Sequence, residues 1–166
     1  KKRNPKIILA SISGFGQNGP YAKRPGFDQI AQGMGGLMSI TGPGKDDGPV
    51  KVGAPVTDIT AGILAAMGAA AAYAGKLATG HGTRVDTSLF EAGITQTYWQ
   101  SAIALATGVS PTALGSAHPL NAPYQAFPTA DGYINVGAAN QRNWLRLLQV
   151  LEAEELNDDP RFASNA

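Results

Sequence analysis

The sequence predicts an α/β fold, and three observations support that prediction. Apolar segments of strand length alternate with longer segments in which apolar residues recur at helical spacing. Glycine supplies 21 of the 166 residues, about twice its usual share, so backbones can approach each other closely. Hydrophobic residues make up 43% of the chain and the formal net charge is only +1, which is typical of an ordinary globular domain.

The first elements are a strand and a helix. Residues 6–13 form a continuous apolar run that is too short for a stable helix, which predicts a strand buried on both faces of a parallel sheet. Apolar residues at helical spacing predict a helix over 27–40, because glycine and proline follow it directly. Residues 42–50 are polar and predict a loop.

A longer helix, a second strand and another helix follow. A capping residue, Thr57 or Asp58, precedes an apolar and alanine-rich segment that ends in the Thr-Gly-His-Gly sequence at 79–82. A strand is expected over 84–89 and a helix over 91–106.

The last third of the chain has a different pattern. Residues 107–122 contain repeated glycine and proline and predict a domain boundary or crossover. Two alternating segments within 124–137, around a Thr-Ala-Asp-Gly turn, predict a hairpin. A helix is expected over 144–151, closed by the Asp-Asp-Pro sequence at 158–160. Only two strands are long enough for a parallel sheet, too few for a self-sufficient core, which indicates a piece of a longer protein.

Composition argues against several classes of protein. The balanced charge and the single short basic run at 1–3 give little support to nucleic-acid binding. There is no cysteine, and the two histidines, His81 and His118, have no ligand at metal-binding spacing, so we expect no metal site and interpret both as loop residues.

No segment has the pattern of a secretory signal or of a membrane-spanning helix. The apolar run at 7–12 has the length of a strand, and the apolar stretch at 59–75 is shorter than the roughly 20 residues that cross a bilayer. Together with the lack of cysteine, this leads us to expect a cytoplasmic protein without membrane contact.

Residues 14–19 match the G-x-G-x-x-G pattern of dinucleotide-binding turns, directly after a predicted strand. In such sites the glycines open a helix, whereas here Pro20, Pro25 and Gly26 follow within seven residues. We therefore favour a tight turn over a dinucleotide site.

Two segments carry candidate chemistry. Asp58 lies at the head of the long small-residue helix, where free amide groups and the helix dipole favour its ionised form. It is either a helix cap or a carboxylate able to attack a carbonyl carbon, and Gly62 would leave room for a substrate or allow close packing. Lys23 and Arg24, shortly before Asp28, are either phosphate ligands or solvated side chains.

A set of motifs follows in order along the chain. They are Ser13-Gly14-Phe15-Gly16-Gln17-x-Gly19-Pro20-Tyr21, Arg24-Pro25-Gly26-Phe27-Asp28, Gly36-Leu37-Met38, Val52-Gly53-x-Pro55-x-x-Asp58-x-x-x-Gly62, Thr79-Gly80-x-Gly82-x-x-Val85-Asp86-x-Ser88-Leu89 and Pro123-Tyr124-Gln125-Ala126-Phe127 with Asp131-Gly132-Tyr133. In this order the motifs resemble those of the family III CoA-transferases. The resemblance spans nearly the whole chain, and the order of the motifs makes it specific.

The resemblance implies an architecture. Members of this family form interlocked homodimers, with a Rossmann-like large domain and a smaller inserted α+β domain. By this resemblance, residues 1–106 belong to the large CoA-binding domain, 107–122 to a linker and 123–166 to the beginning of the small domain. Most of the CoA site would then lie outside this chain.

The resemblance also implies a site and a reaction. Asp58 matches the family's catalytic aspartate, which carries CoA as an aspartyl thioester while it passes from an acyl-CoA to a carboxylate. Coenzyme A is a substrate here, so no permanently bound cofactor is expected. The segment that matches the family's CoA-contacting stretch consists of Arg24, Pro25, Gly26, Phe27 and Asp28.

The resemblance also bears on the branch of the family and on the substrate. Relatives that racemise 2-methylacyl-CoA place a histidine where Phe27 stands, and a phenyl ring carries no proton. The segments 115–118 and 123–127 look most like members that act on dicarboxylates such as succinyl-CoA with glutarate. The glycine-rich loop of the formyl and oxalate members has no recognisable match. A racemase-type isomerase and a non-catalytic piece of the parent enzyme remain the alternatives.

Overall fold

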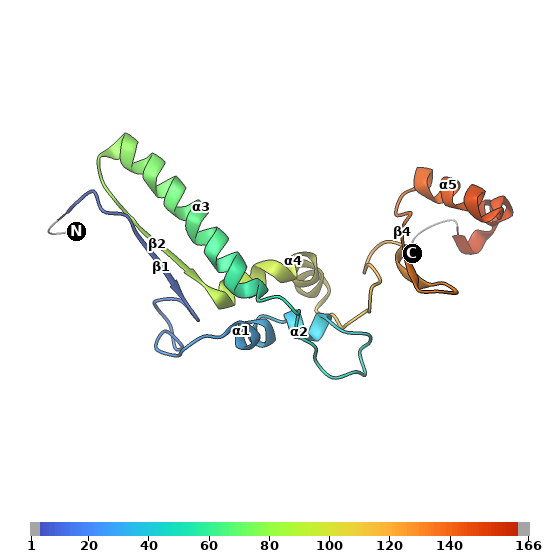
Figure 1. The fold of residues 1–166 in the computed structure, drawn as a ribbon, viewed down its shortest axis with the longest axis horizontal. Helices are drawn as coiled ribbons and strands as arrows, with labels where there is room; N and C mark the ends of the chain where they lie inside the picture. The colour runs from blue at the N-terminus through green and yellow to red at the C-terminus, as the bar shows by residue number, and fades with distance from the viewer. Residues whose placement is uncertain (1–3, 163–166) are drawn as a thin grey trace. The chain divides into compact units, whose positions relative to one another are not determined.

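A parallel pair of strands with a long helix beside it forms the framework of residues 1–113 in this computed structural model, which describes residues 4–162 (Figure 1). Strand β1 (Leu9–Ser13) pairs with β2 (Arg84–Ser88) in parallel register, Leu9 opposite Arg84. Helix α3 (Val56–Thr79) lies between the two strands in chain order and packs against both. Parallel strands require such a crossover connection, so the α/β prediction is confirmed.

Strand β1 is more exposed than its sequence predicts. Leu9 and Ile12 keep 54% and 51% of their side chains exposed, so the expectation of a strand buried on both faces is wrong for this chain. Within the described residues β1 has a single neighbouring strand, and α3 is the helix that packs on the pair.

Small residues form the face of α3 that packs inward. Its buried positions are spaced by four or seven residues, which places them on one face of the helix: Thr57, Ala61, Ala65 and Ala72. A Cβ atom placed on Gly68 would lie 2.5 Å from Cγ1 of Val85, so the helix approaches β2 more closely than a larger residue would permit.

The opposite face of α3 is apolar and exposed. It carries Ile59, Ile63, Met67, Tyr73 and Leu77. The helix has 24 residues and is longer than the apolar stretch alone suggests, so by length and composition it meets the criterion for crossing a membrane. A core helix of a soluble protein meets the same criterion.

The predicted single helix over 27–40 is wrong, because two glycines break it. Helix α1 (Asp28–Met34) ends at Gly35, and α2 (Leu37–Ile40) begins after Gly36, whose φ of +89° is left-handed. Glycine adopts that conformation without steric cost. The break allows Gly35 to approach the backbone of Gly93.

Helix α4 (Leu89–Thr107) extends beyond both ends of its predicted range. Ser88 caps it: the Ser88 hydroxyl accepts the Glu91 N–H at 3.2 Å and donates to Glu91 Oε2 at 2.8 Å. The Ser88 side chain is thus the N-cap of α4, which explains the early start of the helix. Tyr98 interrupts the helical conformation with φ +30°.

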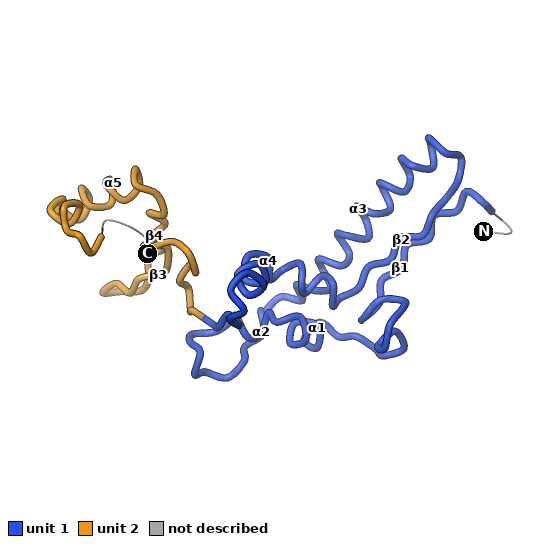
Figure 2. The backbone as a smooth tube through the Cα atoms, turned by 180° about the vertical axis from the view of Figure 1, so that it is seen from behind, with its two compact units in different colours: residues 1–113 blue, residues 114–166 orange. Residues whose placement is uncertain are grey.

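Residues 114–166 form the second compact unit (Figure 2). Strands β3 (Tyr124–Pro128) and β4 (Tyr133–Gly137) pair in antiparallel register, which confirms the predicted hairpin. Helix α5 (Gln141–Leu151) begins three residues before its predicted start, because Asn140 accepts the Asn143 N–H at 2.9 Å and caps it.

Helix α5 ends at Leu151, before the Asp-Asp-Pro sequence expected to close it. Two short 3₁₀ helices, Glu154–Asp158 and Pro160–Phe162, follow. The division between the units, after residue 113, lies inside the segment 107–122. The assignment of the units to domains of a longer chain stays a prediction.

Substituting Gly68 by alanine tests the close approach of α3 to β2. Alanine favours a helix by about 1 kcal/mol over glycine. We expect Gly68→Ala nevertheless to lower the free energy of unfolding by about 1–3 kcal/mol, because the new methyl group overlaps Val85. Gly75 meets nothing within 4 Å, so Gly75→Ala is the control and is expected to be neutral or stabilising. Equal effects of the two substitutions in urea unfolding would contradict this packing.

Candidate active site

The carboxylate of Asp28 joins the start of α1 to the start of α3. Its Oδ1 accepts the Thr57 N–H at 3.0 Å and the Thr57 hydroxyl at 2.8 Å, and its Oδ2 accepts the Gln32 side-chain amide at 2.7 Å. Thr57 and Gln32 are fully buried. We call Asp28, Gln32 and Thr57 the Asp28 cluster.

Gln32 extends this cluster to the loop that precedes α3. Its Oε1 accepts the Val52 N–H at 2.8 Å, and its Nε2 also lies 3.4 Å from the Val52 carbonyl oxygen. A buried amide stabilises a fold only when its donors and acceptors are satisfied, as they are here. The side chain therefore fixes the loop that leads into Asp58.

Asp58 is the third residue of α3, and its side chain does not cap the helix. Pro55 occupies the N-cap position with no side-chain hydrogen bond, and the Thr57 N–H is taken by Asp28. The interpretation of Asp58 as a helix cap is therefore wrong, because a residue 29 positions earlier than Thr57 supplies the acceptor.

The carboxylate of Asp58 is exposed and available. In residues 4–162 no hydrogen bond or ion pair involves this side chain. It lies in the first turn of α3. Two residues further along, Thr60 accepts the side-chain amide of Gln96 at 2.6 Å, which ties this end of α3 to α4.

The ionisation of Asp28 is coupled to these contacts. Burial raises the pKa of this carboxyl group, but hydrogen bonds from the Thr57 side chain and amide, from Gln32 and from the Asp58 amide lower it by more. The pKa of Asp28 therefore lies below its ordinary value, and the group is ionised at neutral pH.

The predicted tight turn at residues 14–19 is confirmed. Gly16 and Gly19 have φ of +87° and +91°, and no helix begins between Asn4 and Asp28. A dinucleotide site would need its glycines at a helix start, so the context for that site is missing in the described chain. A Cβ on Gly26 would lie 2.2 Å from Cα of Gly14, which explains the glycine at both positions.

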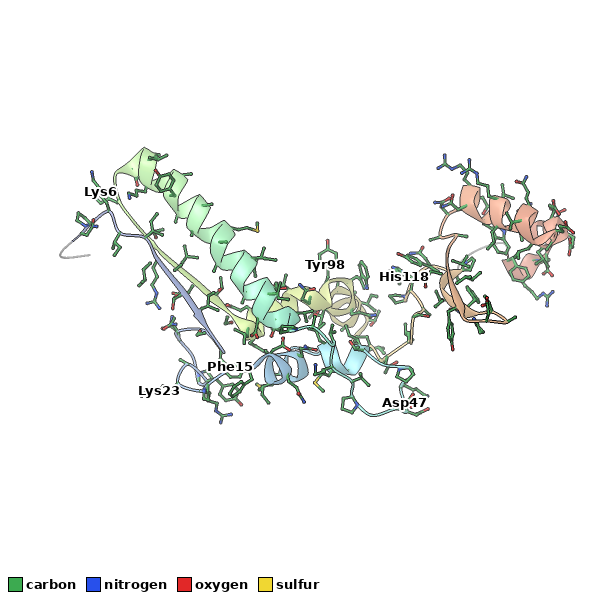
Figure 3. All side chains as sticks on the ribbon, in the orientation of Figure 1. Lys6, Phe15, Lys23, Asp47, Tyr98 and His118 are labelled. Carbon is green, nitrogen blue, oxygen red and sulfur yellow. The ribbon has the colours of Figure 1, made fainter. Side chains whose placement is uncertain are left out.

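The connection between β1 and α1 presents the other residues of the predicted CoA segment, and Figure 3 shows Phe15 and Lys23 on it. The Arg24 guanidinium lies 4.1 Å from the ring centre of the partly buried Tyr21, and its side chain is otherwise exposed. Phe27 is 70% exposed. Arg24, Pro25 and Phe27 thus face solvent here, while Asp28 turns towards α3.

Both histidines lie in connections between elements. His81 Nδ1 is 2.8 Å from the Thr79 carbonyl oxygen, and His118 Nδ1 accepts the Leu120 N–H at 3.1 Å while its ring stacks on Tyr124. No group of three or more metal-ligating side chains occurs in the part of the chain that the structure describes.

Sequence reasoning missed Gln32 and Thr57. Gln32 has the same helical context as its exposed neighbour Gln29, and a threonine before Asp58 reads as an ordinary capping residue. The alignment of Asp28 with Thr57 depends on tertiary packing, so the sequence carries no local signal for it.

Comparison with known proteins identifies the family. The model of CoA-transferase family III matches residues 1–166, so the chain belongs to this family. It is 41% identical over 162 residues to a succinate–glutarate CoA-transferase of Agrobacterium fabrum, covering 98% of this chain and 40% of the relative. An acetyl-CoA:oxalate CoA-transferase of Acetobacter aceti is 38% identical over 167 residues, covering 99% and 42%.

Solved structures agree with this assignment. A CaiB/BaiF family protein from Brucella suis superposes with a TM-score of 0.78 at 40% identity, over 98% of this chain and 43% of that one. A Mycobacterium tuberculosis protein superposes with a TM-score of 0.83 at 26% identity, over 98% and 42%. The chain thus spans about 40% of the length of the curated relatives it matches.

The lowered pKa of Asp28 predicts a pH-dependent contribution to stability. The folded-state pKa lies below the unfolded value of about 3.9, so the ionised group stabilises the fold above that pH, and the contribution is lost as the pH falls through the folded pKa. Asp28→Asn should therefore be less stable than wild type at about pH 7, and the difference should shrink below about pH 4. A pH-independent difference in free energy of unfolding would contradict this.

Gln32→Leu tests the buried amide. We expect it to lower the free energy of unfolding by about 1–3 kcal/mol, because the partly buried Val52 N–H loses its acceptor. Gln29→Leu on the same helix is the control, since Gln29 is exposed, and it should change stability by less than about 0.5 kcal/mol. Chemical denaturation of both variants measures the difference, and equal losses would refute the assigned role.

Proposed function

We propose that the complete protein carrying this chain transfers coenzyme A from an acyl-CoA thioester to a carboxylic acid, with Asp58 as the covalent nucleophile. The observation that carries the proposal is the exposed carboxylate of Asp58, which has no side-chain partner in residues 4–162, at the head of α3. Membership of CoA-transferase family III supports the reaction class.

The reaction proceeds by exchange of acyl groups on Asp58. Its carboxylate attacks the carbonyl carbon of the donor thioester, the carbon–sulfur bond breaks, and CoA thiolate leaves, so that a mixed anhydride between the donor acyl group and Asp58 forms. The thiolate then attacks the Asp58 carbonyl carbon and releases the donor carboxylate, which leaves an aspartyl-CoA thioester. The acceptor carboxylate attacks the carbonyl carbon of this thioester, its carbon–sulfur bond breaks, and a second mixed anhydride and CoA thiolate form. The thiolate then attacks the acceptor acyl carbon of this anhydride, which releases the acceptor acyl-CoA and the Asp58 carboxylate.

The relatives suggest the substrates. The names of the similar proteins include succinate–glutarate and succinyl-CoA:mesaconate CoA-transferases, so we propose succinyl-CoA as donor and a dicarboxylate as acceptor. Arg24 is proposed to contact a CoA phosphate, since a guanidinium pairs well with phosphate oxygens, and residues 25–27 are proposed to complete this contact. An interlocked homodimer is proposed for the complete protein.

A racemase-type reaction has less support. Exchange of an α-proton needs an acid or base on each face of the substrate carbon, and Phe27 stands where such racemases place a histidine. Its exposed phenyl ring supplies no proton. The other alternative is that this chain, taken alone, is a non-catalytic piece of the parent enzyme.

Trapping the covalent intermediate tests the proposal. The complete protein is incubated with succinyl-CoA, treated with borohydride or hydroxylamine, and the modified peptide is identified by mass spectrometry. We expect modification at Asp58, and we expect Asp58→Asn to lose turnover by about 10⁴-fold or more. Asp47→Asn, in an exposed loop, is the control and should react like wild type. Full turnover of Asp58→Asn would refute the nucleophile, and the absence of an adduct despite CoA binding would favour an isomerase or an inactive relative.

A further inference from the structure

The amide groups in the first turn of α3 compete with a substrate for the carboxylate of Asp58. Amide groups in the first turn of a helix lack intrahelical acceptors and attract nearby carboxylates. Pro55, at the N-cap position, has no side-chain acceptor to offer them. Asp58 lies in that same turn, so without another acceptor its own side chain would be drawn to the helix end instead of to a substrate.

The structure supplies the other acceptors from outside the helix. The Val56 N–H donates to the Ala54 carbonyl oxygen at 2.8 Å, and the Thr57 N–H donates to Asp28 Oδ1 at 3.0 Å. The Asp58 N–H also interacts with the Asp28 carboxylate. The Val56 and Thr57 amides are therefore satisfied without the Asp58 side chain.

We propose that Asp28 is a positioning residue for the nucleophile: by accepting the first-turn amides of α3, it leaves the carboxylate of Asp58 free to attack the thioester. This inference rests on the proposed function of Asp58. Asp28 acts through Asp58, and Gln32 holds Asp28 in place through Oδ2 while it binds Val52 in the loop before α3.

This role differs from the CoA contact that the family resemblance implies for Asp28. Both of its carboxylate oxygens already accept hydrogen bonds from within the chain, Oδ1 from Thr57 and Oδ2 from Gln32. A residue that contacts CoA affects the KM for acyl-CoA. A residue that positions Asp58 affects the rate of adduct formation and leaves acyl-CoA binding intact.

Asp28→Ala in the complete protein tests this distinction. We expect the rate of Asp58 modification by succinyl-CoA, measured by rapid quench and mass spectrometry, to fall by about 100-fold, the loss typical of a misplaced reacting group. The Kd for CoA should stay within about twofold of wild type, well under the tenfold that 1.4 kcal/mol represents. The matched control is Ser88→Ala, which removes the side-chain cap of α4 in the same way. It should lower the melting temperature but leave the adduct rate unchanged.

The outcomes separate this inference from the proposed function. An Asp58 adduct that forms in Asp28→Ala at the wild-type rate, or a loss explained wholly by weaker CoA binding, would overturn the inference while the nucleophile stands. A loss equal to that of Ser88→Ala would overturn it as well. No adduct in wild-type protein would overturn the proposed function, and the inference with it.

A second pair of variants covers the case in which Asp28→Ala does not fold. Thr57→Val keeps the shape of the side chain but removes the hydroxyl that donates to Asp28 Oδ1, whereas Thr57→Ser keeps the hydroxyl. We expect Thr57→Val to slow adduct formation and Thr57→Ser to restore most of the rate, with CoA affinity unchanged in both. Equal rates in the two variants would contradict the positioning role.

Discussion

The hydrogen bonds between Asp28 and Thr57 join the beginnings of two helices that are 29 residues apart in the chain. They form only when α1, the loop at 51–55 and α3 are all in place. Gln32 contributes to the same arrangement from the buried side of α1. A single carboxylate thus connects the start of α1 to the first turn of α3, which also carries Asp58.

Close approach of small residues makes this arrangement possible. Gly14 and Gly26 nearly touch through their backbones, and Gly68 places α3 directly against Val85. Small residues remove little apolar surface from water, so this packing depends more on fit and on satisfied polar groups than on large buried side chains. Several larger apolar residues, Ile63 and Met67 among them, stay exposed in a chain that spans about 40% of its relatives' length.

Two carboxylates near one helix end lie in different surroundings. Asp28 accepts several hydrogen bonds, its pKa is lowered, and both of its oxygens are occupied. Asp58 is exposed and has no side-chain partner in the described part of the chain. Separating a structural carboxylate from a reactive one by environment is a general way to keep one acid available for chemistry. Membership of CoA-transferase family III is consistent with this division.

The sequence by itself determined what depends on local pattern: the α/β class, the hairpin of residues 114–166, and helix α3, which begins within two residues of its expected start. It also placed Asp58 at a helix head. Tertiary structure decided the break at Gly35 and Gly36, the exposure of β1 and the cluster around Asp28. The spacing of apolar residues shows which of them share one face of one helix or strand. A hydrogen bond between residues 29 positions apart depends instead on how several elements pack.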